Sequence, residues 1–198
     1  MDEIRRRLSE GESIFDITWG AGWQVKYPSL ALLSKYAGIW SGCSHNSEFD
    51  FGASVRCGSW FHSTDYEILK FKASGTQDDA LKSFDQRIAA WIEANGEDKL
   101  KDLKRGWMHG EEWRLLYPSI AKWAEHGKRY CFSLKFKLGG ESEVKAWFYD
   151  KAANRETVLL EQTIDDSGKS LEILNQCIKN WLEDNVELLA EFKRVEIE

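Results

Sequence analysis

The sequence predicts an α+β fold in which a three-stranded antiparallel β-meander followed by an amphipathic helix occurs twice in tandem. Three observations predict it: residues that recur at a constant spacing, runs of alternating polarity that end in turns, and two long segments with helical periodicity. We expect the two repeats to be related by a pseudo-twofold axis. Their sheets are expected either to join edge to edge or to pack through their unpaired faces.

The recurring residues lie 90 positions apart. Near the start of the unit, five residues return in the same order: Trp23, Tyr27, Pro28, Ser29 and Ala31 become Trp113, Tyr117, Pro118, Ser119 and Ala121. Near its end, five more return: Leu81, Ile88, Trp91, Glu93 and Asn95 become Leu171, Ile178, Trp181, Glu183 and Asn185. Because the spacing is the same at both ends of the unit, the pattern indicates an internal duplication.

The duplication sets the expected domain boundaries. Residues 1–96 form the first repeat with an N-terminal extension, residues 97–106 a charged linker, and residues 107–198 the second repeat. About ninety residues in each repeat are enough for a modest hydrophobic core. The linker is expected to add a further helical turn or two.

Each repeat opens with a tryptophan, a short run expected to be extended, and the sequence Tyr-Pro-Ser. Proline disfavours helix in the residue before it but is tolerated in the first turn of a helix. A short helix is therefore expected after each proline, over residues 30–36 and 120–125. Gly38 and Gly127 follow where these helices would end.

Alternating polarity predicts three strands in each repeat. In the second repeat, apolar residues at every second position predict a strand over residues 130–138, and Gly139-Gly140 predicts the hairpin turn that follows. The next strand lies around residues 144–148 and a third near 157–161. In the first repeat the alternation is less regular, and the strands are expected over residues 39–44, 54–62 and 66–72.

An amphipathic helix closes each repeat. One apolar stripe recurs in both helices: Leu81, Phe84, Ile88, Trp91 and Ile92 in the first, and Leu171, Leu174, Ile178, Trp181 and Leu182 in the second. Thr76, with Asp79 three residues later, predicts an N-terminal cap, and Gly96 predicts the end of the first helix. A single apolar face needs a cover, which the sheet supplies.

The composition predicts a soluble cytoplasmic protein. Charged residues make up 30% of the chain and hydrophobic residues 42%, an ordinary globular balance. No apolar run is long enough to span a membrane, and the charged N-terminus shows no secretory signal. The four cysteines do not match between the repeats and are expected to stay reduced. A net charge of -6 argues against nucleic acid as a partner.

The chain contains ten tryptophans, its most unusual compositional feature. Six recur in pairs and are expected in the cores: Trp23 with Trp113, Trp60 with Trp147, and Trp91 with Trp181. The expected binding surface lies on the first repeat, where aromatic side chains neighbour a polar loop: Trp19, Trp23, Trp40, His45 and Asn46. Such a mixture suits recognition of a protein partner, and a merely irregular hairpin is the alternative.

Four side chains of the first repeat belong to the types that bind zinc: Cys43, His45, Cys57 and His62. Their spacing matches no standard zinc motif, and on a strand over residues 54–62 the last two would point to opposite faces. We therefore expect no metal and no cofactor. No nucleophile motif surrounds either cysteine, so we expect no catalytic cysteine.

Glu143 and Lys145 reproduce the E-x-K pattern of metal-dependent nucleases. That chemistry also needs an aspartate on a preceding strand, and no Asp lies between Asp102 and Asp150. Charges that alternate with Val144 are explained more simply as the solvent face of a strand. The sequence therefore predicts no catalytic residue.

The stretch from Trp107 to Asn185 resembles the C-terminal accessory module of bacterial PD-(D/E)XK nuclease-like proteins. The resemblance lies in a Trp-rich run, a helical turn that ends in glycine, the strand over residues 130–138, the hairpin, and the helix that carries Trp181. The 198 residues contain no nuclease half. The resemblance therefore implies a module of microbial or phage origin that recognises something rather than cutting it.

We expect a non-enzymatic protein-binding module, of the inhibitor or immunity type, from a bacterium or phage. Excess aromatic residues, a mild acidic balance and a duplicated scaffold favour this function. Two alternatives stay open: a domain that recognises a small molecule or nucleotide in a cleft between the repeats, and a nuclease-associated accessory module. The sequence identifies neither the partner nor the oligomeric state.

Overall fold

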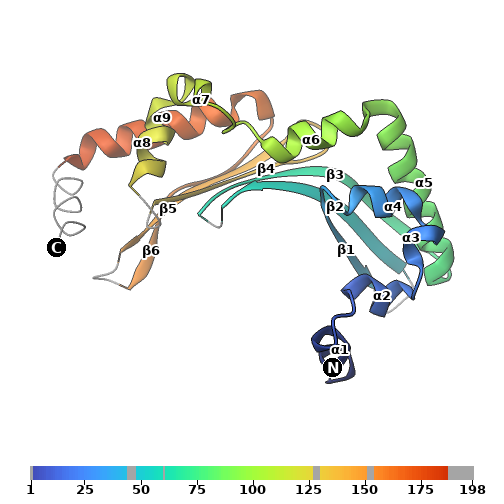
Figure 1. Ribbon diagram of the computed structural model, residues 1–198. Helices are drawn as coiled ribbons and strands as arrows, with labels where there is room; N and C mark the ends of the chain where they lie inside the picture. Colours follow the sequence, from blue (N-terminus) through green and yellow to red (C-terminus); the bar gives the residue numbers. More distant parts are fainter. Residues whose placement is uncertain (1, 44–47, 60, 127–129, 151–153, 187–198) are drawn as a thin grey trace. The chain divides into compact units, whose positions relative to one another are not determined.

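A computed structural model describes residues 2–43, 48–59, 61–126, 130–150 and 154–186. These residues form an α+β fold with a six-stranded mixed sheet, as Figure 1 shows. The strands follow one another in chain order: β1 (Gly38–Cys43), β2 (Glu48–Gly58), β3 (His62–Ser74), β4 (Tyr130–Phe136), β5 (Ser142–Asp150) and β6 (Arg155–Ile164). The predicted α+β class is confirmed, and the strands of both predicted repeats join edge to edge.

Helices flank the strands in the same order in both halves of the chain. The first half contains α1 (Asp2–Ser9), α2 (Ile14–Trp19), α3 (Trp23–Lys26), α4 (Pro28–Leu33), α5 (Gln77–Asn95) and α6 (Glu97–Arg105). The second contains α7 (Glu112–Leu116), α8 (Pro118–Glu125), the 3-10 helix η1 (Ser167–Lys169) and α9 (Ser170–Asp184). Two short helices, then three strands, then a long helix occur in both halves, and the first half has α1, α2 and α6 in addition. None of the described helices is long and apolar enough to cross a membrane.

The run between the tryptophan and the proline is helical, so the expectation of an extended segment is wrong. The backbone N–H of Tyr27 donates to the carbonyl of Trp23 at 2.8 Å, and Tyr117 donates to Trp113 at 2.8 Å. Both tyrosines then leave the helical region, with φ and ψ of -130° and 70° at Tyr27 and -129° and 64° at Tyr117. Proline restricts only the residue directly before it, which leaves room for a helical turn upstream.

Side chains of the long helices hold the short helices α4 and α8 at their N-termini. The Asp85 carboxylate on α5 accepts a hydrogen bond from the backbone N–H of Leu30 at 2.8 Å. Asn175, 90 positions further along on α9, accepts from Ser119 at 3.0 Å and from Ile120 at 3.2 Å. The first N–H groups of a helix have no partner within it, so these side chains satisfy groups that would otherwise be unpaired.

The antiparallel meander predicted for the second repeat is present. Strand β4 pairs with β5 in an antiparallel register that places Lys135 opposite Glu143, and β5 pairs with β6 so that Lys145 lies opposite Glu161. A register shift between Ala146 and Trp147 marks a β-bulge. By contrast, β3 and β4 run parallel, over the pairs from His62 with Phe132 to Tyr66 with Phe136.

The expected pseudo-twofold axis between the two repeats stays a prediction. Strand β4 lies next to β3 in the strand order and runs parallel to it.

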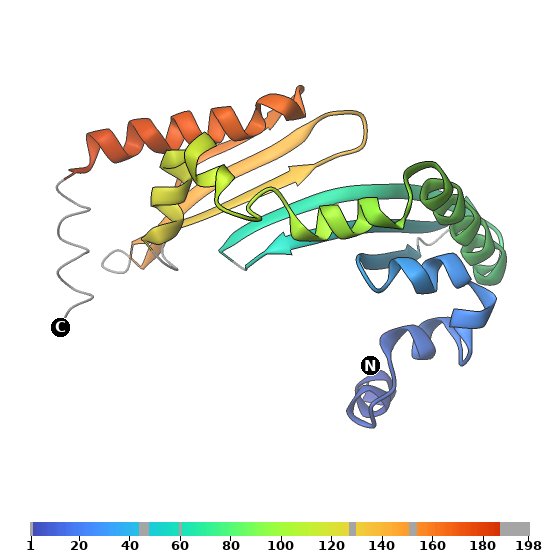
Figure 2. The same cartoon turned by 45° about the horizontal axis from the view of Figure 1, so that its top comes forward.

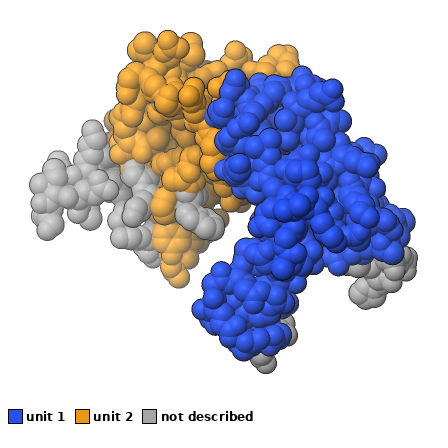
Figure 3. Space-filling view, turned by 45° about the vertical axis from the view of Figure 1, so that its right-hand side comes forward, with its two compact units in different colours: residues 1–53, 69–101 blue, residues 54–68, 102–198 orange. Residues whose placement is uncertain are grey.

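The chain divides into two compact units, coloured separately in Figure 3. Unit 1 comprises residues 1–53 and 69–101, and unit 2 comprises residues 54–68 and 102–198. Residues 54–68 belong to unit 2, because the first part of β3 pairs with β4. The predicted linker is mostly helix α6, whose Leu100 is fully buried.

Aromatic and aliphatic residues from α4, α5, β2 and β3 are buried in unit 1. The Phe84 ring of α5 stacks on Phe51 with 4.9 Å between centroids and lies 6.3 Å from Phe71. Leu30 and Leu33 of α4 are completely buried. The predicted cap is confirmed at the start of α5, where Thr76 Oγ1 accepts from the backbone N–H of Asp79 at 3.2 Å.

In unit 2, helices α7, α8 and α9 cover one face of β4, β5 and β6, as Figure 2 shows. Trp123 of α8 is fully buried against Tyr130 and Trp181, with ring centroids 4.7 and 5.2 Å away. The Trp107 indole donates to Thr64 Oγ1 at 2.8 Å, which ties the tip of β3 to the segment before α7. Large aromatic side chains therefore form much of this core.

Trp181 and Trp91 occupy matching positions on α9 and α5, and both are half-buried. Trp181 contacts the rings of Trp123, Tyr130 and Phe148. Trp181→Ala is therefore expected to lower the free energy of unfolding by about 3 kcal/mol, and by more than Trp91→Ala does. Chemical denaturation of both variants measures the difference, and a larger loss for Trp91→Ala would contradict it.

The stability of the cap at Asp85 is expected to depend on pH. Burial raises the pKa of Asp85, although the N–H groups of Leu30 and Ser29 favour the charged form. The folded state therefore keeps this proton to a higher pH than the unfolded chain, so this group's contribution to stability falls as pH rises from the unfolded pKa through the folded one.

Asp85→Asn introduces the residue found at position 175. It is expected to remove the loss of stability that ionisation of Asp85 causes as pH rises. Relative to the natural chain, the variant should gain stability as pH rises from the pKa of an unfolded-state aspartate, about 4, through the higher pKa of folded Asp85, where the carboxyl ionises. Denaturation midpoints measured across this range test the expectation. A stability difference that is the same at both ends of the range would show that ionisation of Asp85 is not its cause.

Candidate functional site

In unit 2, no described helix of this unit covers the sheet face opposite α8 and α9 (Figures 1 and 2). This face carries charged side chains. The alternation of strand residues separates the two faces. On β4, Phe132 and Leu134 are buried in the core beneath the helices, whereas Lys135 is exposed on the other face. We name this second surface the charged face. It consists of Arg56, Ser63, Asp65, Ser133, Lys135, Glu143, Lys145, Glu161 and Thr163.

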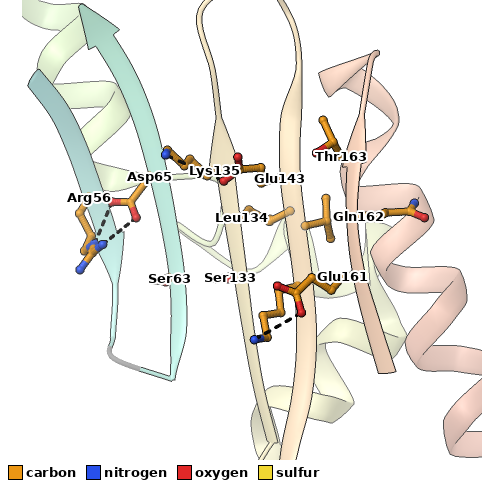
Figure 4. Close-up of a pocket in the computed structure, with 12 residues that line it drawn as sticks. Arg56, Ser63, Asp65, Ser133, Leu134, Lys135, Glu143, Glu161, Gln162 and Thr163 are labelled. Atoms are coloured by element: carbon orange, nitrogen blue, oxygen red, sulfur yellow. Dashed lines mark hydrogen bonds and ion pairs between the residues drawn. The ribbon is translucent and has the colours of Figure 1, made fainter. Parts of the chain in front are cut away.

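The strand register places opposite charges side by side on the charged face, as Figure 4 shows. Two guanidinium nitrogens of Arg56 donate to the two carboxylate oxygens of Asp65, both at 2.8 Å. This bidentate bond raises the pKa of Arg56. Lys135 lies directly opposite Asp65 on β4 and 3.9 Å from a Glu143 oxygen on β5. Four strands thus contribute one row of alternating charge.

A second row runs beside the first. Ser63 lies opposite Ser133, and Ser133 opposite Lys145, whose Nζ is 3.6 Å from a Glu161 oxygen. The same ammonium group lies 5.5 Å from the centre of the Trp147 ring. The row therefore combines an ion pair, a cation–π contact and small hydroxyl groups.

The two rows border an open hollow of about 690 Å³. Three basic residues and three acidic residues line it, so the formal charges cancel. Exposed ion pairs contribute at most about 1 kcal/mol each to folding. The ion pairs of the two rows therefore add little to the stability of the fold.

Glu143 and Lys145 lie on the charged face, as the alternation on β5 predicts. Glu143 pairs with Lys137 at 2.7 Å and with Lys135, whereas Lys145 pairs with Glu161. The nearest aspartate of this face, Asp65, lies on β3, with β4 between it and β5. No group of three His, Cys, Asp or Glu side chains able to hold a metal occurs among the described residues. The E-x-K pattern is accounted for by cross-strand ion pairs.

Among the binding residues predicted in the first repeat, the structure describes Trp19, Trp23 and Trp40. Trp19 and Trp23 are only 8% and 4% exposed, and their rings pack with Phe15 at 4.5 and 5.2 Å. Their burial removes them from the surface that a partner could contact. His45 and Asn46 lie outside the described residues.

Trp40 is 45% exposed on β1, so it keeps the surface position that was predicted. Its indole lies over Gly52 of β2, where a Cβ atom would overlap the ring. Gly52 therefore permits a close approach of the indole to the backbone, which is the role expected of a glycine within a strand.

Of the four residues considered for zinc, Cys57 and His62 have described side chains, and each bonds to a backbone carbonyl. Cys57 is buried on β2 with its sulfur 3.6 Å from the Thr64 carbonyl, and burial raises the pKa of its thiol. His62 lies on β3, not on the same strand as predicted, and its Nε2 is 2.7 Å from the Tyr130 carbonyl. Burial lowers the pKa of His62, so the neutral ring donates this bond. The side chain of Cys43, and His45, lie outside the described residues.

Sequence reasoning did not identify the charged face. The alternation of Lys135 on β4, Glu143 and Lys145 on β5, and Glu161 on β6 was visible as a polar face of each strand. The pairing of β3 with β4, which adds Arg56 and Asp65, joins residues about seventy positions apart and leaves no local pattern. The sequence therefore contained a local pattern for the residues of the charged face on β4, β5 and β6, but none for Arg56 and Asp65.

Comparison with protein-family models, with curated proteins and with solved structures finds no match. The resemblance to a nuclease accessory module therefore stays a prediction based on aromatic spacing. What can be inferred about function depends on the geometry of the described residues.

We expect protein purified without added metal to contain no stoichiometric zinc. Cys57 and His62 bond to backbone carbonyls of different strands and not to one another, so two of the four ligands would have to leave satisfied positions. Elemental analysis of the purified protein measures the metal content. One equivalent of zinc that disappears in Cys43→Ser would contradict this expectation.

Proposed function

We propose that this protein is a non-enzymatic binding module that recognises another protein through the charged face of unit 2. The observation that supports it is the pair of rows in which Arg56, Lys135 and Lys145 alternate with Asp65, Glu143 and Glu161 around an open hollow. A protein surface offers both signs of charge at matching spacing, and complementary charges then select the partner and speed its association.

The balance of charges distinguishes a protein partner from nucleic acid. Binding to a phosphate backbone needs a surplus of basic groups, because affinity comes from neutralising phosphates. Here each basic side chain has an acidic neighbour, and the chain as a whole carries a net charge of -6. Phosphates approaching this face would meet carboxylates at the same spacing as the ammonium groups.

A small molecule or nucleotide is the second candidate ligand. The hollow of about 690 Å³ has the volume of a small-molecule site, and strands from both predicted repeats line it. Such sites are usually enclosed and lined mostly by apolar side chains. Because this hollow is open and charged, we favour the protein partner.

We also infer that the two halves of the chain are a tandem duplication. The tyrosine before each proline has the same conformation, and Asp85 and Asn175 cap equivalent helices. Asn95 and Asn185 both donate from their side-chain amides to the carbonyl four residues earlier, at 2.9 and 2.8 Å. Repetition of unusual local features supports a common origin for the two halves.

We propose that the protein is an inhibitor or immunity-type protein of bacterial or phage origin and that it acts in the cytoplasm. Such proteins work by occupying a surface of their target, and they need no chemistry of their own. The charged face suits that task, because its charges would steer the encounter with the target and an inhibitor must reach its target quickly.

The proposal is tested by comparing two matched charge reversals. Lys135→Glu combined with Lys145→Glu reverses the charge at two of the basic positions on the charged face. The control, Lys99→Glu combined with Lys104→Glu, makes the same change in net charge at exposed lysines of α6. A partner captured by the natural chain should bind the first variant at least about tenfold more weakly and the second almost unchanged.

Association with that partner should also slow as salt is raised, because ions screen the charges that steer it. Thermal unfolding of both variants serves as the control for folding. Equal loss of binding in the two variants, at unchanged stability, would place the interface elsewhere. A partner that binds the first variant as well as the natural chain would refute the proposed role of the charged face.

A further inference from the structure

A second surface of unit 2 exposes apolar side chains beside a groove. Leu115 is 84% exposed, Leu116 68% and Val186 63%. These residues border a groove of about 660 Å³ between the α7–α8 segment and α9, with Leu182 and Pro118 also in its lining. Large apolar side chains gathered in this way are more typical of a binding surface than of a surface in contact only with water.

The matching positions of the first half show which features of this groove are particular to unit 2. Val25, the counterpart of Leu115, is also exposed, at 88%. The next position differs: the counterpart of Leu116 is Lys26, whose Nζ lies 3.0 Å from the Asp78 carboxylate. Likewise, Val186 replaces Gly96. The second half has therefore exchanged an ion-paired lysine and a glycine for exposed apolar side chains.

The groove also contains two lysines that have no lysine counterpart in the first half. Lys122 on α8 stands where the first half has Leu32, and Lys179 on α9 stands where it has Ala89. Lys122 is exposed and makes no ion pair with another described residue, and the Lys179 ammonium lies 3.9 Å from Glu183. The groove thus has one ammonium group on each wall and a single carboxylate.

The framework of the groove has not changed. Asn175 caps α8 as Asp85 caps α4, so the two helix pairs are held in the same way. Leu116, Lys122, Lys179 and Val186 differ from their counterparts in the first half, and all four line the exposed groove. These differences alter what the groove can bind without altering how the helices pack. Folding alone does not require these changes, because α4 and α5 pack without them.

We propose that this groove binds an amphipathic helix with acidic flanks that belongs to another protein. A helix laid between α8 and α9 would cover Leu115, Leu116 and Val186 with its apolar stripe, in the manner of helix-in-groove recognition. Carboxylates on its flanks would pair with Lys122 and Lys179 on the two walls. This inference concerns a different surface from the charged face and does not depend on it.

The first test uses two synthetic helical peptides of roughly five turns. One carries leucines at i, i+4, i+7 and i+11 with glutamates on both flanks, and the other has every glutamate replaced by lysine. Fluorescence anisotropy with the full chain should show binding of the acidic peptide and at least about tenfold weaker binding of the basic one. Equal binding of the two peptides, or no binding of the acidic one, would overturn the proposal.

Matched variants locate the site. Leu116→Lys installs the residue of the first half and should weaken binding of the acidic peptide at least about tenfold, whereas Val25→Lys should leave it unchanged. Lys122→Glu should shift preference toward the basic peptide. Because Leu116 and Val25 are both exposed, thermal unfolding is expected to stay unchanged in both variants. An equal effect of Val25→Lys would overturn the assignment.

Two further measurements exclude other occupants. If the acidic peptide binds only after residues 187–198 are removed, the chain's own C-terminal segment fills the groove and the proposal is wrong. If the natural chain self-associates in sedimentation experiments and Leu116→Lys abolishes this, a second copy is the occupant and the proposal is also wrong. Binding by the full-length monomer supports it.

Discussion

The parallel pairing of β3 with β4 is the interaction on which unit 2 depends. It runs from His62 opposite Phe132 to Tyr66 opposite Phe136, and the Phe132 N–H donates to the Phe61 carbonyl at 2.9 Å. His62 bonds to the Tyr130 carbonyl across the same junction. This pairing assigns the hairpin tip to unit 2 and sets Asp65 beside Lys135, so the charged face exists only because these two strands meet.

The two halves share the arrangement of their short and long helices but differ in the residues exposed on those helices. The short helices, their caps at Asp85 and Asn175, and the aromatic residues beneath them recur in both halves. Surface residues between these elements can differ at little cost, because substitutions away from the core usually change stability by no more than about 0.5 kcal/mol. The apolar groove with Lys122 and Lys179 in unit 2, and the Lys26–Asp78 pair in unit 1, illustrate this freedom.

Local signals predicted much of the fold. The Thr76 cap, the turn at Gly139-Gly140 and the alternation on β4 each arise from interactions within a few residues, so the sequence displays them directly. The helical turns of α3 and α7 were missed, because only the residue before proline carries a local restriction. Trp19 was expected at the surface, and Trp23 was assigned both to the core and to the binding surface. Packing against Phe15 buries both, and neighbouring sequence does not reveal such packing.

By itself, the sequence determined the α+β class, the order of the main helices and strands, and the alternation on β4 and β5, because alternation, caps and turns depend on neighbouring residues. Only the tertiary structure decided that β3 pairs in parallel with β4, that residues 54–68 belong to unit 2, and that Arg56 and Asp65 complete the charged face. The physical reason is that strands pair through backbone N–H and C=O groups. Nearly every residue carries these groups, so the identity of a distant partner strand leaves almost no trace in the side chains.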